Sequence, residues 1–99
     1  MKAQNILLLT IDSLRADHTP CLNYDRPVAP RLAEFSGQGA TFRQAVANGP
    51  NTTASFPSIL TGAYSLTYGP YGICGHNSPF LSKSLRGAGF QTVGYHSNP

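Results

Sequence analysis

The sequence predicts an α/β fold in which a mostly parallel sheet is flanked by helices. Three observations predict it. Residues 5–12 are a continuous run dominated by apolar side chains, strand-like and helix-like hydrophobic periods follow one another along the chain, and 10 Gly and 8 Pro residues separate these segments. The predicted order is strand, helix, strand, helix, helix, strand. With 99 residues, the chain fits one domain or part of one.

Three segments are predicted to be strands. Residues 5–12 (NILLLTID) suit a strand that is buried on both faces of a parallel sheet. Residues 40–49 alternate apolar and polar side chains, which indicates a second strand, and residues 91–96 (QTVGYH) indicate a third. Residues 13–27 and 62–80 are rich in Gly, Pro and polar side chains, so we expect them to be loops.

Three other segments are predicted to be helices. Residues 29–39 have a proline, Pro30, placed for a first helical turn, and glycines at Gly37 and Gly39 that can end the helix. Pro57 lacks a backbone N–H group, so it belongs in the first turn of a helix over residues 54–61. Residues 78–90 place two leucines one turn apart before a glycine, which predicts the third helix.

The charge pattern narrows the class of partner. The formal net charge of +3 comes from 7 basic and 4 acidic residues, and the basic residues are scattered rather than clustered. We therefore expect no nucleic-acid partner. A mild positive balance suits a small anionic substrate. The apolar run of residues 6–11 is too short for a membrane span or a secretory leader, so we expect a cytoplasmic protein without a membrane span.

Cysteine and histidine residues form no recognisable metal motif. We expect Cys21 and Cys74 to be free thiols in an intracellular protein, with a disulfide between them as the alternative. His18, His76 and His96 have no partner at metal-ligand spacing, so we expect them to be surface or core histidines.

Asp12 is the first candidate functional residue. It ends the first predicted strand, and ligands of open α/β sheets collect beyond the carboxyl ends of the strands. A carboxylate there is a suitable ligand for a hard divalent cation. The alternative is that Asp12 only turns the chain into the following loop, where Asp is common.

The stretch NTTASFPSILTG contains the second candidate, because Thr52 and Thr53 precede the helix predicted there. A threonine at this place can cap the helix by accepting a backbone hydrogen bond. The same N–H groups and the helix dipole can instead hold a phosphate or sulfate, which a threonine hydroxyl could attack. Caps far outnumber nucleophiles, so the stretch alone favours a cap.

In combination, four segments closely resemble the amino-terminal part of the sulfatase family, a member of the alkaline-phosphatase superfamily. They are NILLLTIDSLRADH, YDRPVAPRLAEFSGQGATFRQAVANGP, TTASFPSILTG and SLRGAGFQTVGYHSNP. The resemblance implies a partial alkaline-phosphatase-like fold and a metal-dependent hydrolase of sulfate or phosphate esters. The family's remaining metal ligands come from later in its catalytic domain. We therefore expect residues 1–99 to be an incomplete segment of that domain, and its open sheet edge to allow a homo-oligomer.

The resemblance also assigns roles to single residues. Asp12 matches the first of two acidic metal ligands, and Ser13 stands where the second would be. Thr52 falls at the nucleophile position, which is also a metal-ligand position and is Cys or Ser in sulfatases. Ser55 matches the serine of that motif, whereas Phe56 replaces its arginine, a planar anion clamp.

The threonine changes the chemistry that the resemblance implies. Thr52 cannot yield the formylglycine aldehyde of sulfatases, so we expect none. A plain Thr nucleophile is similar to that of nucleotide pyrophosphatase/phosphodiesterases and of lipoteichoic-acid-synthase-like phosphoglycerol transferases. Thr52 would then attack the ester with the help of a divalent metal ion, Ca²⁺, Mg²⁺, Mn²⁺ or Zn²⁺. Thr53 is the alternative nucleophile, and Thr53 and Ser55 are expected to contact the substrate. The alternative function is a truncated, non-catalytic fragment or an anion-binding module.

Overall fold

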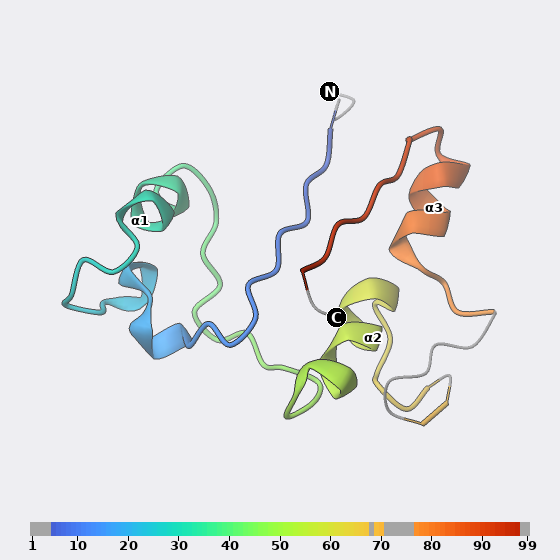
Figure 1. Cartoon of the computed structure of the whole chain (residues 1–99), viewed down its shortest axis with the longest axis horizontal. Helices are drawn as coiled ribbons and strands as arrows, with labels where there is room; N and C mark the ends of the chain where they lie inside the picture. Colours follow the sequence, from blue (N-terminus) through green and yellow to red (C-terminus); the bar gives the residue numbers. More distant parts are fainter. Residues whose placement is uncertain (1–4, 68, 71–76, 98–99) are drawn as a thin grey trace. The chain divides into compact units, whose positions relative to one another are not determined.

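The structure is a computed structural model that describes residues 5–67, 69–70 and 77–97. Its regular elements are short helices, connected by turns and extended chain (Figure 1). The chain divides into two compact units, Met1–Ala45 and Val46–Pro99, and each is described by itself.

The described residues of the first unit form one α-helix and two 3₁₀ helices. Helix α1 spans Pro30–Ser36, which confirms the helix predicted over residues 29–39, with the proline in its first turn as expected. The 3₁₀ helices η1 (Ala16–His18) and η2 (Pro20–Leu22) lie in the predicted loop, and α1 contacts η2. This contact gives the first unit its compact part.

The second unit contains α2 (Thr52–Thr61) and α3 (Leu81–Gly87), which contact each other. Helix α3 confirms the third predicted helix. Helix α2 is also confirmed, but it begins at Thr52 rather than near residue 54. Pro57 therefore lies inside the helix and not in its first turn. It cannot donate the α-helical hydrogen bond to Thr53, and the helix tolerates this single missing bond.

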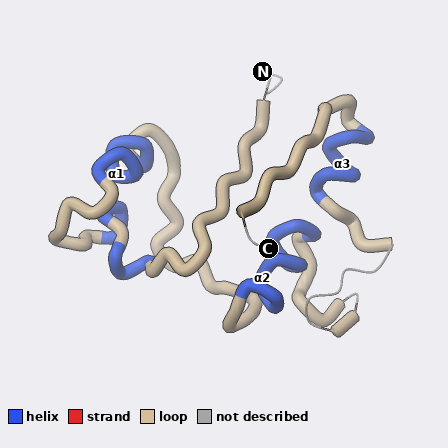
Figure 2. The backbone as a smooth tube through the Cα atoms, in the orientation of Figure 1, coloured by secondary structure: helices blue, strands red, loops and turns tan. Residues whose placement is uncertain are grey.

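The predicted parallel sheet is wrong. The described part of the chain has no β-strand, as Figure 2 shows by its lack of red segments. Residues 5–12, 40–49 and 91–96 are extended chain or turns instead. A strand exists only when its backbone is hydrogen bonded to a neighbouring strand, and the sequence pattern indicates side-chain burial without supplying that neighbour. The side chains confirm the difference, because Leu7 is 87% exposed and Val46 is 90% exposed.

Burial in the second unit is concentrated at the beginning of α2. Ala54 is 2% exposed, and Pro57 and Ser58 of the same helix are also buried. Apart from Pro57, Ala54 is the only apolar residue among the described residues that is buried. The most buried apolar side chain of the described residues is therefore next to the threonines that the sequence analysis identified.

None of the helices within the described ranges is long and apolar enough to cross a membrane.

Gly49 provides a test of this packing. A Cβ atom at Gly49 would lie 2.3 Å from Ala54 Cβ and 2.9 Å from the Ala54 carbonyl carbon, so the backbone would have to move. We expect Gly49→Ala to lower the free energy of unfolding in urea by about 1–3 kcal/mol. Gly87→Ala is the matched control, since nothing lies within 4 Å of its added Cβ, and it should change stability by less than about 1 kcal/mol. Equal effects of the two substitutions would contradict the close approach.

Candidate active site

Thr52 and Thr53 are the first two residues of α2, and both are exposed. The sequence had placed them before the helix as possible caps. In the structure the cap is Asn51, whose side-chain Oδ1 accepts a hydrogen bond of 2.9 Å from the Ala54 N–H. The helix start is thus stabilised by Asn51, and the threonines lie in the first turn itself.

Their position in the first turn has an electrostatic consequence. The first N–H groups of an α-helix have no carbonyl partner within the helix and point out of its end. Together with the helix dipole they favour an anion at that end. Helix α2 has no acidic side chain in its first turn to compete for this place. The start of α2 is therefore suited to a phosphate or sulfate group.

Ser55, the predicted substrate contact, has a structural partner here. Its Oγ donates a hydrogen bond of 2.9 Å to the Gly49 carbonyl. A serine hydroxyl has one proton, so in this arrangement only its lone pairs are left for another partner. Ser55 holds the loop that leads into α2, and its contact with a substrate stays a prediction.

Asp12 lies in the first unit and is exposed. It is followed by Ser13, whose backbone has a positive φ of 57°. This left-handed conformation is costly for a residue with a Cβ, and such conformations concentrate at functional turns. Asp12 and Thr52 belong to different units, so the structure describes the two proposed site residues separately.

The described residues do not make a complete metal site. No group of three or more His, Cys, Asp or Glu side chains within residues 5–67, 69–70 and 77–97 could hold a metal ion. Asp12 supplies one carboxylate, and hard divalent cations bind about six oxygens or more. The donor set present in these residues therefore does not by itself fit such an ion. The prediction for His76 and Cys74 falls outside the described residues, whereas Cys21 is a free thiol.

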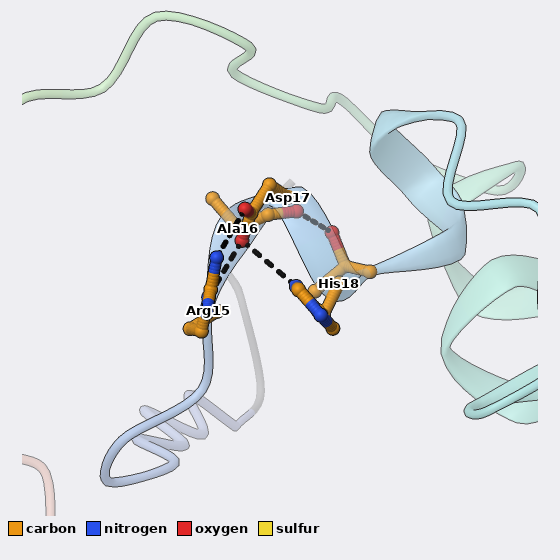
Figure 3. A network of polar contacts seen from close by, with 5 residues as sticks. Arg15, Ala16, Asp17 and His18 are labelled. Atoms are coloured by element: carbon orange, nitrogen blue, oxygen red, sulfur yellow. Dashed lines mark hydrogen bonds and ion pairs between the residues drawn. The ribbon is translucent and has the colours of Figure 1, made fainter.

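The sequence reasoning missed a polar network around Asp17, shown in Figure 3. Arg15 donates to both oxygens of the Asp17 carboxylate, over 3.0 Å and 2.6 Å, and His18 Nδ1 lies 3.0 Å from Asp17 Oδ1. The His18 ring also lies against Tyr24, with ring centroids 4.6 Å apart. The charged side chains of the segment RADH were a signal for this network, but they come into contact only because the chain forms a 3₁₀ turn there.

The network changes the acidity of Asp17. Hydrogen bonds from Arg15 and then His18 hold the pKa of the Asp17 carboxyl well below its usual range, and the same carboxylate raises the pKa of Arg15. All three side chains are largely exposed, so the network orders the turn after Asp12 more than it stabilises the whole chain.

Asp12 begins an exposed turn of the first unit, and the start of α2 in the second unit is suited to an anion. The model of the sulfatase family matches residues 4–99, and the chain belongs to the sulfatase family. That family generally uses a metal ion. No curated protein and no solved structure matched the chain in the corresponding searches.

The lowered pKa of Asp17 gives a pH prediction. A carboxyl whose pKa is lowered in the folded chain stabilises the turn in which it lies. This stabilisation is complete above the unfolded-state pKa of about 4, and it is lost as the pH falls through the folded-state pKa. We expect the Arg15–Asp17 contact to persist at pH values where an unperturbed carboxyl is already half protonated. A carbon NMR titration of Asp17 measures this directly, and Arg15→Gln should move its pKa back toward the usual range. An unchanged Asp17 titration in that variant would contradict the network.

The incomplete donor set gives a metal prediction. Calorimetric titration of the 99-residue chain with Ca²⁺ or Mg²⁺ should show a dissociation constant no tighter than about 10⁻⁴ M, as for other weak oxygen-ligand sites. Asp12→Asn should remove what binding there is. Binding tighter than about 10⁻⁶ M would mean that ligands beyond Asp12 complete the site.

Proposed function

We propose that this chain carries the nucleophile of a sulfatase-like hydrolase of sulfate or phosphate esters, and that Thr52 is that nucleophile. One observation carries the proposal. Thr52 is the exposed first residue of α2, at a helix end suited to an anion, in a chain that matches the sulfatase family over residues 4–99.

The anionic part of the ester would bind at the start of α2. Backbone N–H groups of the first turn would contact its oxygens, and the neighbouring Thr53 hydroxyl would donate to them. The Ser55 hydroxyl would join them by turning its proton from the Gly49 carbonyl to the ester. These contacts would orient the sulfur or phosphorus atom toward Thr52. Because they strengthen as negative charge develops on the transferred group, they would favour the transition state.

Thr52 Oγ1 would then attack the bound ester in line with the leaving group. A bond forms between Oγ1 and the sulfur or phosphorus as the bond to the leaving oxygen breaks, and the hydroxyl proton passes to water or to that oxygen. The covalent threonine ester would afterwards pass its group to water or to an alcohol. Both acceptors regenerate the Thr52 hydroxyl.

We further propose Asp12 as one ligand of the divalent ion that the family uses, whether Ca²⁺, Mg²⁺, Mn²⁺ or Zn²⁺. When bound, such an ion would neutralise charge on the ester oxygens. The described residues supply too few oxygens to hold it alone, so the steps above rest on the chain's own groups.

Phosphate and sulfate esters are both within the proposal. Thr52 replaces the residue that sulfatases convert into an aldehyde, and Phe56 replaces an arginine that would grip the anion. The first departure favours a phosphate ester as the substrate, because a plain hydroxyl nucleophile suits phosphoryl transfer. The second removes a planar anion clamp and so weakens the case for a sulfate ester.

A hydrolysis assay tests the proposal. Aryl sulfate, phosphate monoester and phosphodiester substrates are offered to the purified chain, each with Mg²⁺, Mn²⁺, Ca²⁺ and Zn²⁺ in turn. We expect Thr52→Ala to lower kcat by roughly 10³-fold or more, because removal of a nucleophile abolishes the covalent step. Thr53→Ala, the neighbouring substitution, removes an anion contact and should raise KM while kcat stays within about tenfold of the parent chain. The reverse result would make Thr53 the nucleophile.

The second candidate function is an anion-binding module without turnover. The absence of a three-residue metal cluster from the described residues favours it. Three results together would support this module. Inorganic phosphate would shift the amide signals of residues 52–54, a chelator would leave these shifts unchanged, and no ester would be turned over. A folded chain that neither binds phosphate nor turns over any ester would contradict both functions.

A further inference from the structure

The hydroxyl of Ser65 joins three segments of the second unit. Ser65 is 8% exposed and follows α2 in a turn. Its Oγ lies 2.5 Å from the Ala54 carbonyl oxygen and 3.2 Å from the Asn48 carbonyl oxygen. It also lies 3.1 Å from the Ser58 hydroxyl. These partners are 11, 17 and 7 residues away in the sequence, so Ser65 forms the longest-range polar contacts described around α2.

The direction of these hydrogen bonds follows from the groups involved. A carbonyl oxygen only accepts, so Ser65 must use its single proton toward Ala54 and Asn48. It can then only accept from Ser58, whose own proton is thereby used. Ser58 is 7% exposed, which makes an unpaired hydroxyl costly at that position. The two serines thus form a directed chain that ends on the two carbonyls.

One of those carbonyls belongs to the loop that leads into α2. Asn48 precedes Gly49, whose backbone approaches Ala54 so closely that a Cβ would not fit. Ser55 donates to the Gly49 carbonyl from the helix side. The loop is therefore held on the first turn from two directions, by Ser65 and by Ser55. This loop continues directly into the capping residue and Thr52.

We propose that Ser65 is a positioning residue for Thr52. Its hydroxyl fixes the loop before α2 against the carbonyl side of the first turn, and so fixes where Thr52 begins the helix. Ser65 is buried and need not contact the substrate. Its catalytic consequence rests on the proposed function of Thr52, whereas its effect on the helix start does not.

The first measurement is amide hydrogen exchange in Ser65→Ala. The substitution removes the buried hydroxyl that donates to the carbonyls of Asn48 and Ala54. The amides of Ala54 and Ser55, which are hydrogen bonded to Asn51, should therefore exchange about tenfold faster or more. Amides of residues 84–89 in and after α3 should stay within about twofold of the parent chain. Ser84→Ala is the matched control, because the Ser84 hydroxyl makes a 3.4 Å contact with a carbonyl one turn away on an exposed helix.

The second measurement is activity. Ser65→Ala should lower kcat by about tenfold and also raise KM, because the loosened helix start carries both the nucleophile and the N–H groups that bind the anion. Ser65→Thr keeps the hydroxyl and should restore both kcat and slow exchange at the helix start. A uniform rise in exchange across both helices would overturn the proposal, since Ser65 would then only stabilise the unit. An unchanged kcat in an active enzyme would overturn it as well.

The two measurements separate this inference from the proposed function. If the parent chain turns over no ester but Ser65→Ala loosens only residues 54–55, the positioning of Thr52 by Ser65 stands and the proposed hydrolase activity fails. If Thr52→Ala abolishes turnover while Ser65→Ala changes neither exchange nor kcat, the proposed function stands and the positioning role fails.

Discussion

The close approach of the Gly49 backbone to Ala54 is the contact on which the second unit depends. It leaves no room for a Cβ at Gly49, and it brings two carbonyl groups of the loop within reach of buried serine hydroxyls. Ala54 is the best-buried apolar side chain described, so dispersion and hydrogen bonding act at the same place. The loop and the start of α2 approach this closely because the residues between them are small. Larger side chains at these positions would separate the loop from the helix.

This arrangement explains why serines, rather than large apolar residues, line the buried part of the unit. A loop that crosses a helix start brings carbonyl oxygens into a partly buried place, where a hydroxyl donor replaces water. Ser55 and Ser65 supply such donors with small side chains. The apolar core of the described residues is correspondingly small. Many of their large apolar side chains are exposed, as Leu7 is at 87%.

The sequence predicted the helices well, but it did not predict contacts between residues that are distant in the sequence. All three helices were predicted from proline and glycine positions, but α2 began two residues early because the Asn51 cap outweighed the preference of Pro57 for a first turn. The strands failed because an apolar pattern such as that of residues 5–12 shows that a segment can pair and not what it pairs with. Ser65 was invisible for the same reason, since its partners are up to 17 residues away. The order of the motifs did predict the family, because that order is a property of the sequence and does not depend on which residues are in contact.

At the start of α2, one side chain caps the helix and a different side chain is the proposed nucleophile. This difference determines what a substitution of the proposed nucleophile can show. If Thr52 were the cap, its substitution would also weaken the helix start, and a loss of activity would then not identify Thr52 as a nucleophile. The cap is Asn51, and the loop is held by Ser55 and Ser65. The fold of the helix start therefore does not need a capping hydroxyl at Thr52. Thr52→Ala therefore leaves the Asn51 cap and the loop contacts of Ser55 and Ser65 in place, so a loss of activity in this variant is not explained by a lost cap.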